Sequence, residues 1–220
     1  QVEDELRAMG LTVERVAGAD VYGTSMACTG YLMEHGGSTQ YAIACSPASF
    51  VDAVSISGWA YANKIPVMLQ TWGSTAGERG FDEAAAQVIS GRDLVVCGGA
   101  GAVSDASVSG LGARSITRLG GDTLYDTNKA IVEFSLAHGM SAADVTVASD
   151  IYSFSGVDAL AASALAGRKG GVVLLAQSNP AYEPEPETDS ALGFISEHKD
   201  EIKSVHVLGG EIAQTPEFYQ

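Results

Sequence analysis

The chain has 220 residues, of which 46% are hydrophobic and 18% charged, and 27 Asp and Glu against 12 Lys and Arg give a formal net charge of −15. This length is enough for one or two domains with a buried core. The acidic balance excludes binding to a nucleic acid backbone or an anionic membrane surface, because both need clustered Lys and Arg. The sequence has no apolar run of about 20 residues, so it predicts no membrane span.

The first residues predict a helix, Val2 to Met9, followed by a strand, Leu11 to Val16. No signal peptide precedes them, and we interpret residues 1–11 as the end of a preceding repeat. The following elements alternate between helices and short apolar runs that do not alternate in polarity, which is typical of strands buried on both faces of a parallel sheet. The predicted helices are Tyr22–Glu34, Ala53–Asn63 and Asp82–Ile89, and the predicted strands are Tyr41–Cys45, Pro66–Leu69, Leu94–Cys97, Ser115–Leu119, Val145–Ala148, Val172–Leu175 and Val205–Leu208.

The chain repeats itself with a period of a little over one hundred residues. The offset is 103 at Arg15 and Arg118, and it grows to 106 at Asp52 and Asp158, as expected when insertions fall in surface loops. We therefore predict two tandem repeats, residues 12–112 and 113–220, each a Rossmann-like α/β unit with a doubly wound, mainly parallel sheet. The motif residues shared by both copies are Arg15, Gly18, Tyr22, Thr24, Gly98 and Gly99 in the first, and Arg118, Gly121, Tyr125, Thr127, Gly209 and Gly210 in the second.

Polar residues flank the predicted helices in matching places. Asp52, Asp158, Ser104 and Thr215 precede helices, as N-caps do. His35-Gly36 and His138-Gly139 are typical of helix ends, with a cation at the negative end of the dipole and a glycine after it. The cysteines are Cys28, Cys45 and Cys97, and their apolar neighbours indicate buried thiols rather than disulfides or zinc ligands.

In the order and spacing of these motifs, nearly the whole chain resembles the cell wall binding repeat type 2 family of Gram-positive surface proteins. The sequence departs from the family pattern at its second arginine, which is Val21 and Leu124 here, and at a proline, which is Val51 and Val157. The resemblance implies a secreted, extracellular, noncovalent anchor to anionic cell-wall polysaccharide, whose repeats pack in threes around a pseudo-threefold axis. We expect the shared motif residues to be structural. The resemblance, together with the position of two aspartates at strand ends, makes these residues the ligand-binding candidates: Val67, Met68, Leu69, Val173, Leu174, Leu175, Asp52 and Asp158.

Other interpretations remain open at this point. The apolar candidates also fit core strands, and the two aspartates also fit helix caps. The fragment is expected to carry no catalytic residues, no metal site and no cofactor, although a hydrolase using Asp52 or Asp158 is a rival hypothesis. A self-associating scaffold or adhesin is another, with neighbouring repeats or a second copy as partners. An acidic loop, residues 183–189, is a weak candidate for cation binding.

Overall fold

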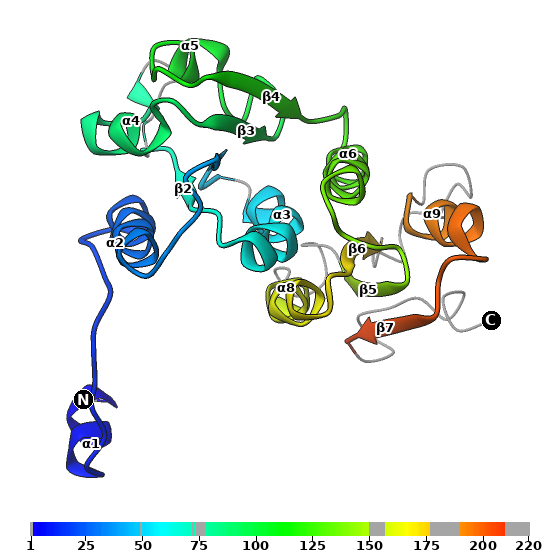
Figure 1. Ribbon diagram of the computed structural model, residues 1–220, viewed down its shortest axis with the longest axis horizontal. Coiled ribbons are helices and arrows are strands. Elements are labelled where there is room, and N and C mark those ends of the chain that lie inside the picture. The colour runs from blue at the N-terminus through cyan, green and yellow to red at the C-terminus, as the bar shows by residue number, and fades with distance from the viewer. Residues whose placement is uncertain are drawn as a thin grey trace.

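The computed structural model describes residues 2–48, 50–71, 73, 78–149, 157–176 and 190–209. Two parallel sheets form the body of the molecule (Figure 1). The first, sheet A, has the order β2-β1-β3-β4, with β1 Tyr41–Cys45, β2 Val67–Leu69, β3 Asp93–Cys97 and β4 Ser115–Leu119. The second, sheet B, has the order β6-β5-β7, with β5 Asp144–Ser149, β6 Val172–Ala176 and β7 Ser204–Leu208. The predicted fold, two tandem α/β repeats with parallel sheets, is confirmed.

Helices connect the strands, as parallel pairing requires. Their bounds are α1 Val2–Ala8, α2 Val21–Glu34, α3 Phe50–Asn63, α4 Glu83–Ile89, α5 Asp105–Val108, α6 Leu124–Ala137, α8 Val157–Lys169 and α9 Ser190–His198. Asp20 and Thr123 cap the equivalent helices α2 and α6 by accepting backbone N–H bonds. Both helices end at the predicted histidine, and Gly36 and Gly139 follow it with positive φ.

The two faces of sheet A are covered by different neighbours. On one face, Leu94 and Val96 of β3 pack against α4 and α5, and both side chains are fully buried. On the other face, Val95 and Cys97 join a core cluster that continues into sheet B. The hydrophobic core is therefore shared between the repeats.

Helices α3 and α8 occupy equivalent places in the two repeats and pack against each other. The Ser163 hydroxyl donates to the Val54 carbonyl across this contact at 3.1 Å. A side chain at Gly167 would place its Cβ 2.6 Å from the Gly58 carbonyl oxygen, so only glycine permits this approach. The Trp59 indole N–H adds a bond to the His138 carbonyl at 3.2 Å.

Strand β4 crosses the boundary between the repeats. By sequence it opens the second repeat, since the predicted boundary lies at residues 112 and 113, yet it pairs with β3 over all five of its residues, from Asp93 with Ser115 to Cys97 with Leu119. The chain then leaves β4 and enters α6, whose Asn128 bonds to β6 of sheet B. In space, the sheet of the first repeat therefore ends at Leu119.

The N-terminal segment, residues 2–18, differs from its counterpart in the first repeat. Helix α1 forms almost as predicted, but Leu11–Val16 is not a strand, so that prediction is wrong. A strand needs a partner, and no side chain between Val2 and Gly18 is fully buried. Figure 1 shows α1 (blue) standing away from both sheets. Glu3 holds the segment together through ion pairs with Arg7 and Arg15, each at 2.6 Å.

Candidate functional site

The apolar element that the resemblance implicates in binding is residues 67–69 in the first repeat and 173–175 in the second. It is partly exposed in the first repeat and buried in the second. In the first repeat, Val67 and Leu69 are half-buried while Met68 is fully buried. In the second, Val173, Leu174 and Leu175 are all buried, with at most 2% of each exposed. Side-chain contact with a ligand is therefore open to Val67 and Leu69 alone among these six residues.

Packing between the repeats explains this difference. Val51 and Val54 of α3 lie in one cluster with Val173 and Leu175, so the first repeat covers the second repeat's strand. The edge of each strand is also held by a polar side chain of α2 in the first repeat and of α6 in the second. In the second repeat, Asn128 accepts from Leu175 N at 3.1 Å and donates to the Val173 carbonyl at 3.0 Å.

In the first repeat, Ser25 takes the place of Asn128. Its hydroxyl oxygen accepts from Leu69 N at 3.2 Å. These bonds satisfy backbone groups at the edge of each sheet. The apolar element thus has a structural role in both copies, and only the first copy leaves part of it facing solvent.

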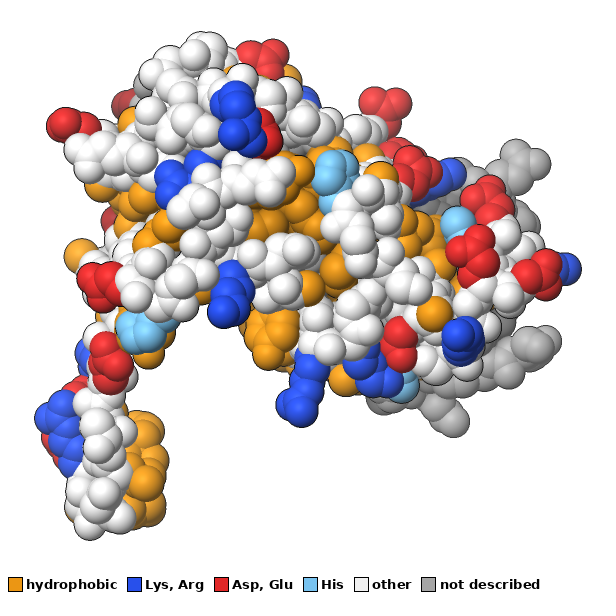
Figure 2. Space-filling view, in the orientation of Figure 1, with side chains coloured by type: hydrophobic (Ala, Val, Ile, Leu, Met, Phe, Trp, Pro, Cys, Tyr) orange, Lys and Arg blue, Asp and Glu red, His pale blue; other side chains and the backbone are white. Residues whose placement is uncertain are grey.

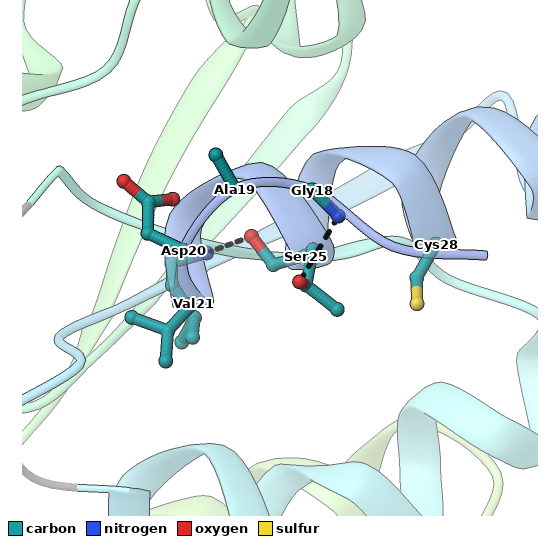
Figure 3. A pocket seen from close by; sticks show the side chains of 8 residues that line it. Gly18, Ala19, Asp20, Val21, Ser25 and Cys28 are labelled. Atoms are coloured by element: carbon teal, nitrogen blue, oxygen red, sulfur yellow. Dashed lines mark hydrogen bonds between the residues drawn. The ribbon is translucent and has the colours of Figure 1, made fainter. Parts of the chain in front are cut away.

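A cavity of about 590 Å³ lies at the start of α2, where two of the family motifs meet (Figure 3). Gly18 N donates to the Thr24 hydroxyl at 3.1 Å, and Gly121 N donates to Thr127 at the same distance. A Cβ at Gly18 would lie 2.1 Å from the Gly23 carbonyl carbon, so this turn requires glycine. The cavity is lined by Gly18, Ala19, Asp20, Val21, Thr24, Ser25, Cys28 and Leu69.

The side chains that line this cavity offer few groups that could bind a ligand specifically. Val21, where the family pattern has its second arginine, is 57% exposed and supplies an apolar wall. Cys28 is exposed here, so the prediction of three buried thiols is wrong at this position, because its side chain lies on the open side of α2. The other two thiols are buried, and the neighbouring Cys45 together with burial raises the pKa of Cys97 well above its ordinary value.

Tyr22 of this motif faces the start of α4. Burial, together with the nearby Asp82 carboxylate, raises the pKa of Tyr22 to about 12. In turn, the Tyr22 hydroxyl and the Ala85 backbone N–H lower the pKa of Asp82, which is the N-cap of α4. The hydroxyl of the motif tyrosine is therefore buried close to the N-cap of α4.

The two candidate aspartates lie inside the first turns of α3 and α8, not at the cap positions, because Phe50 and Val157 already belong to these helices. Asp52 is 5% exposed, and its Oδ2 would lie 2.6 Å from a Cβ at Gly98. Gly98 also has φ +101°, so the carboxylate approach and the turn after β3 both require glycine. Asp158 is half-buried.

The remaining motif residues divide between the sheets and the N-terminal segment. Arg118 donates from Nη1 to the Gly98 carbonyl at 2.8 Å and from Nη2 to Asp105 at 2.7 Å. Arg15 instead pairs with Glu3. Gly99, Tyr125 and Gly209 lie at the expected turns and helix. Gly210, Thr215 and the acidic loop 183–189 lie outside the described residues.

A basic groove lies on a surface that the sequence did not indicate. It has a volume of about 890 Å³ and lies where α2, α3 and α8 end and β2 and β6 begin. Figure 2 shows Lys and Arg side chains beside exposed hydrophobic surface near the ends of α3 and α8. Its lining contains three cations, one histidine and no carboxylate: Leu32, His35, Ser57, Ala60, Tyr61, Ala62, Lys64, Ile65, Val67, Gly167, Arg168, Lys169 and Gly170.

The groove cations differ in how they are held. Lys169 Nζ donates to Asp144 at 3.0 Å and lies 2.8 Å from His206 Nε2. Burial alone would raise the pKa of Asp144, but Ser204, Lys169 and His206 together lower it. Lys64 and Arg168 make no ion pair with any residue that the structure describes. Two positive charges therefore face the groove without a partner carboxylate in that part of the chain.

The sequence profile of Cell wall binding domain 2 (CWB2) matches residues 15–108 and 118–218. The chain belongs to this family. No curated protein matches it by sequence. Two solved structures are similar: Cwp8 from Clostridium difficile, with a TM-score of 0.71 and 23% identity over 96% of this chain and 33% of that one, and Cwp6 from Clostridium difficile, with a TM-score of 0.71 and 16% identity over 97% and 36%. These likenesses show a shared fold, and this CWB2 chain spans about a third of each.

The described part of this CWB2 chain contains no helix long and apolar enough to cross a bilayer. Within the same residues, no group of three or more His, Cys, Asp or Glu is arranged to hold a metal ion.

Proposed function

We propose that this chain is a noncatalytic module that anchors a secreted surface protein to an anionic cell-wall polysaccharide, and that the groove at the ends of α3 and α8 contacts the polymer. The observation that carries the proposal is the concentration of cations there in a protein with a net charge of −15. An acidic module cannot attract an anion by its net charge, so it needs a local basic surface.

The groove has the mixture of groups that a charged carbohydrate requires. Lys64 and Arg168 supply positive charge, and Tyr61, which is 57% exposed, offers an aromatic surface for a sugar ring. Val67, one of the two accessible candidates from the apolar element, lines the same groove. This placement gives the family's apolar element a route to the ligand in the first repeat.

The C-terminal ends of two helices oppose this attraction and limit its strength. Carbonyl groups at the C-termini of α3 and α8 carry partial negative charge, about half a unit for each helix. Lys169 is already paired with Asp144. The net positive charge left for a ligand is therefore small, which favours weak contacts repeated along a polymer over one tight site.

Retention on cell walls tests the function. The 220-residue chain is mixed with Gram-positive cell walls before and after their secondary polymers are removed, and the bound fraction is measured by sedimentation. We expect retention on native walls that falls with added salt and disappears on stripped walls. Equal retention on both preparations, or none on native walls, contradicts wall-polysaccharide binding.

Charge variants test the groove. Arg168→Gln and Lys64→Gln are each expected to lower retention several-fold, and the double variant further. Lys199→Gln is the matched control, since Lys199 is exposed directly after α9 and does not line the groove. Losses of equal size in Lys199→Gln and Arg168→Gln would assign binding to overall charge and reject the groove.

A further inference from the structure

Two of the three cysteines lie side by side in sheet A. Ala44 of β1 pairs with Val96 of β3, and Cys45 and Cys97 each follow by one residue. Both side chains are fully buried, and both belong to the core cluster that continues into sheet B. Cys45 is also the largest cause of the raised pKa of Cys97, which requires the two thiol groups to be adjacent. The two sulfur atoms are therefore neighbours on the same face of the sheet.

The packing of the fold does not by itself require sulfur at these two positions. In the second repeat, Ala148 of β5 pairs with Leu208 of β7. These positions are equivalent to those of the cysteines, because Cys45 and Ala148 each pair with the last residue of the apolar element in their own sheet. Alanine and leucine thus fill the place that two thiols fill in the first repeat. A buried cysteine packs as a small hydrophobic residue, and what distinguishes it from one is its reactivity.

We propose that Cys45 and Cys97 form a disulfide when the chain folds in an oxidising environment, and that this bond fixes the two central strands of sheet A to each other. Neighbouring strands lie about 4.8 Å apart, within the range of about 4.4–6.8 Å that separates the Cα atoms of disulfides. The Cβ atoms must approach to about 3.8 Å, so the strands shift slightly when the bond forms. The proposal concerns a covalent modification of the chain and does not depend on wall binding.

Thiol–disulfide exchange with a small disulfide, such as oxidised glutathione, supplies the chemistry. One cysteine thiolate attacks the S–S bond of the oxidant, which forms a mixed disulfide and releases one glutathione thiolate. The second cysteine thiolate then attacks the chain's sulfur in the mixed disulfide and releases the other glutathione. The two cysteine sulfurs together lose two electrons and two protons. The oxidant gains them and becomes two thiols.

The folded sheet protects the reduced pair from this reaction. Neither side chain has any exposed surface. Cys45, burial and the nearby Asp52 carboxylate all raise the pKa of Cys97, so this thiol stays protonated. Because the thiolate is the form that attacks a disulfide, exchange in the folded protein is slow. We therefore expect the bond to form while the sheet closes, and we expect protein that has already folded in the reduced state to resist the same oxidant.

Refolding in a glutathione buffer tests the bond. The chain carries Cys28→Ser, which removes the exposed thiol, and it is unfolded, reduced and refolded with oxidised glutathione. It is then unfolded in acid and treated with an alkylating reagent, and its intact mass is measured. We expect no alkylation and a mass lower than that of the reduced chain by two hydrogen atoms. Two alkylated cysteines, or glutathione adducts in place of the bond within the chain, would overturn the proposal.

The same chain held in concentrated urea with the same glutathione buffer is the control. There the two cysteines meet only through random motion of the unfolded chain, so a several-fold lower yield of the disulfide is expected. Equal yields in urea and during refolding would show that the sheet does not bring the thiols together, and would reject the proposal.

Urea unfolding tests whether the bond fixes the strands. It closes a loop of about fifty residues, which restricts the unfolded chain and favours the folded one. The oxidised chain is expected to unfold at a higher urea concentration than the same chain after reduction. Cys45→Ala in the Cys28→Ser background cannot form the bond and should show no such shift. An oxidised chain with an unchanged or lower midpoint, or an equal shift in the Cys45→Ala control, would contradict the covalent link.

Discussion

The repeats of this CWB2 chain have the same order of elements, but the first builds a four-stranded sheet and the second, in its described residues, a three-stranded one. The difference arises because β4 pairs with the sheet before it while α6, directly after it, packs on the sheet that follows. A unit of sequence repetition is therefore not a unit of packing. The second repeat lends its first strand, β4, to the sheet of the first, and the two repeats share a buried core.

The largest expected loss of stability distinguishes the two side chains that hold the edge strands, Asn128 at β6 and Ser25 at β2. Asn128→Ala removes a buried side chain that bonds Val173, Leu175 and Ser55, and we expect a loss of about 3 kcal/mol in the free energy of unfolding. Ser25→Ala removes one bond to the more accessible β2, where water replaces it, and should cost about 1 kcal/mol or less. Urea unfolding measures both. Equal losses in the free energy of unfolding would mean that the two side chains stabilise their edge strands equally.

The next effect concerns the contact between α3 and α8. Gly167→Ala drives a methyl group against the Gly58 carbonyl and the Tyr61 ring, and should cost about 2 kcal/mol through overpacking. Gly58→Ala is the matched control, since its Cβ would lie 3.6 Å from the Ala166 Cβ, an ordinary contact. Alanine also favours the helix over glycine, so this control should be neutral or slightly stabilising. Thermal unfolding followed by circular dichroism distinguishes the two, and a neutral Gly167→Ala would contradict the tight approach.

A smaller effect compares the motif arginines. Arg118→Ala removes the bonds to Gly98 and Asp105 that tie β4 to the turn after β3, and should cost about 1–2 kcal/mol. Arg15→Ala removes only an exposed ion pair with Glu3 and should cost about 0.5 kcal/mol or less. The comparison is made on the dilute single chain.

The smallest effect is a dependence on pH at the junction of β3 and β4. Arg114 and Ser115 lower the pKa of Asp93 from 3.8 to about 2. A depressed carboxyl pKa stabilises the fold at pH values above its unfolded value, and this contribution is lost as the pH falls from about 4 toward 2. Asp93→Asn should therefore unfold slightly more easily than the parent at pH 6, and the difference should vanish near pH 2. A difference that persists there would exclude the ion pair as its source.

Much of the fold was predictable because local patterns determine it. The runs Tyr41–Cys45 and Ser115–Leu119 form strands with the predicted bounds, and His35 and His138 end their helices as expected. The strand predicted at Leu11–Val16 has the same local pattern but pairs with no strand in the part of the chain that the structure describes. A strand forms only where a neighbouring strand pairs with it, and the hydrophobic pattern of a segment does not show whether such a neighbour is present.

The candidate site was less predictable because it depends on contacts between repeats. Lys64 and Arg168 lie more than one hundred residues apart, and nothing near either in sequence indicates that they share a groove. The available signal was positional, since both stand at the ends of equivalent helices directly before the apolar element. The local sequence likewise does not show that Val54 of the first repeat buries Val173 of the second.

The crossing of β4 from one repeat to the other has a mechanical consequence. A pulling force applied across the two repeats travels along the chain through β4 into α6, because β4 belongs to sheet A and α6 packs on sheet B. The bonds between β3 and β4 therefore lie on the covalent path that carries a load from one repeat to the other.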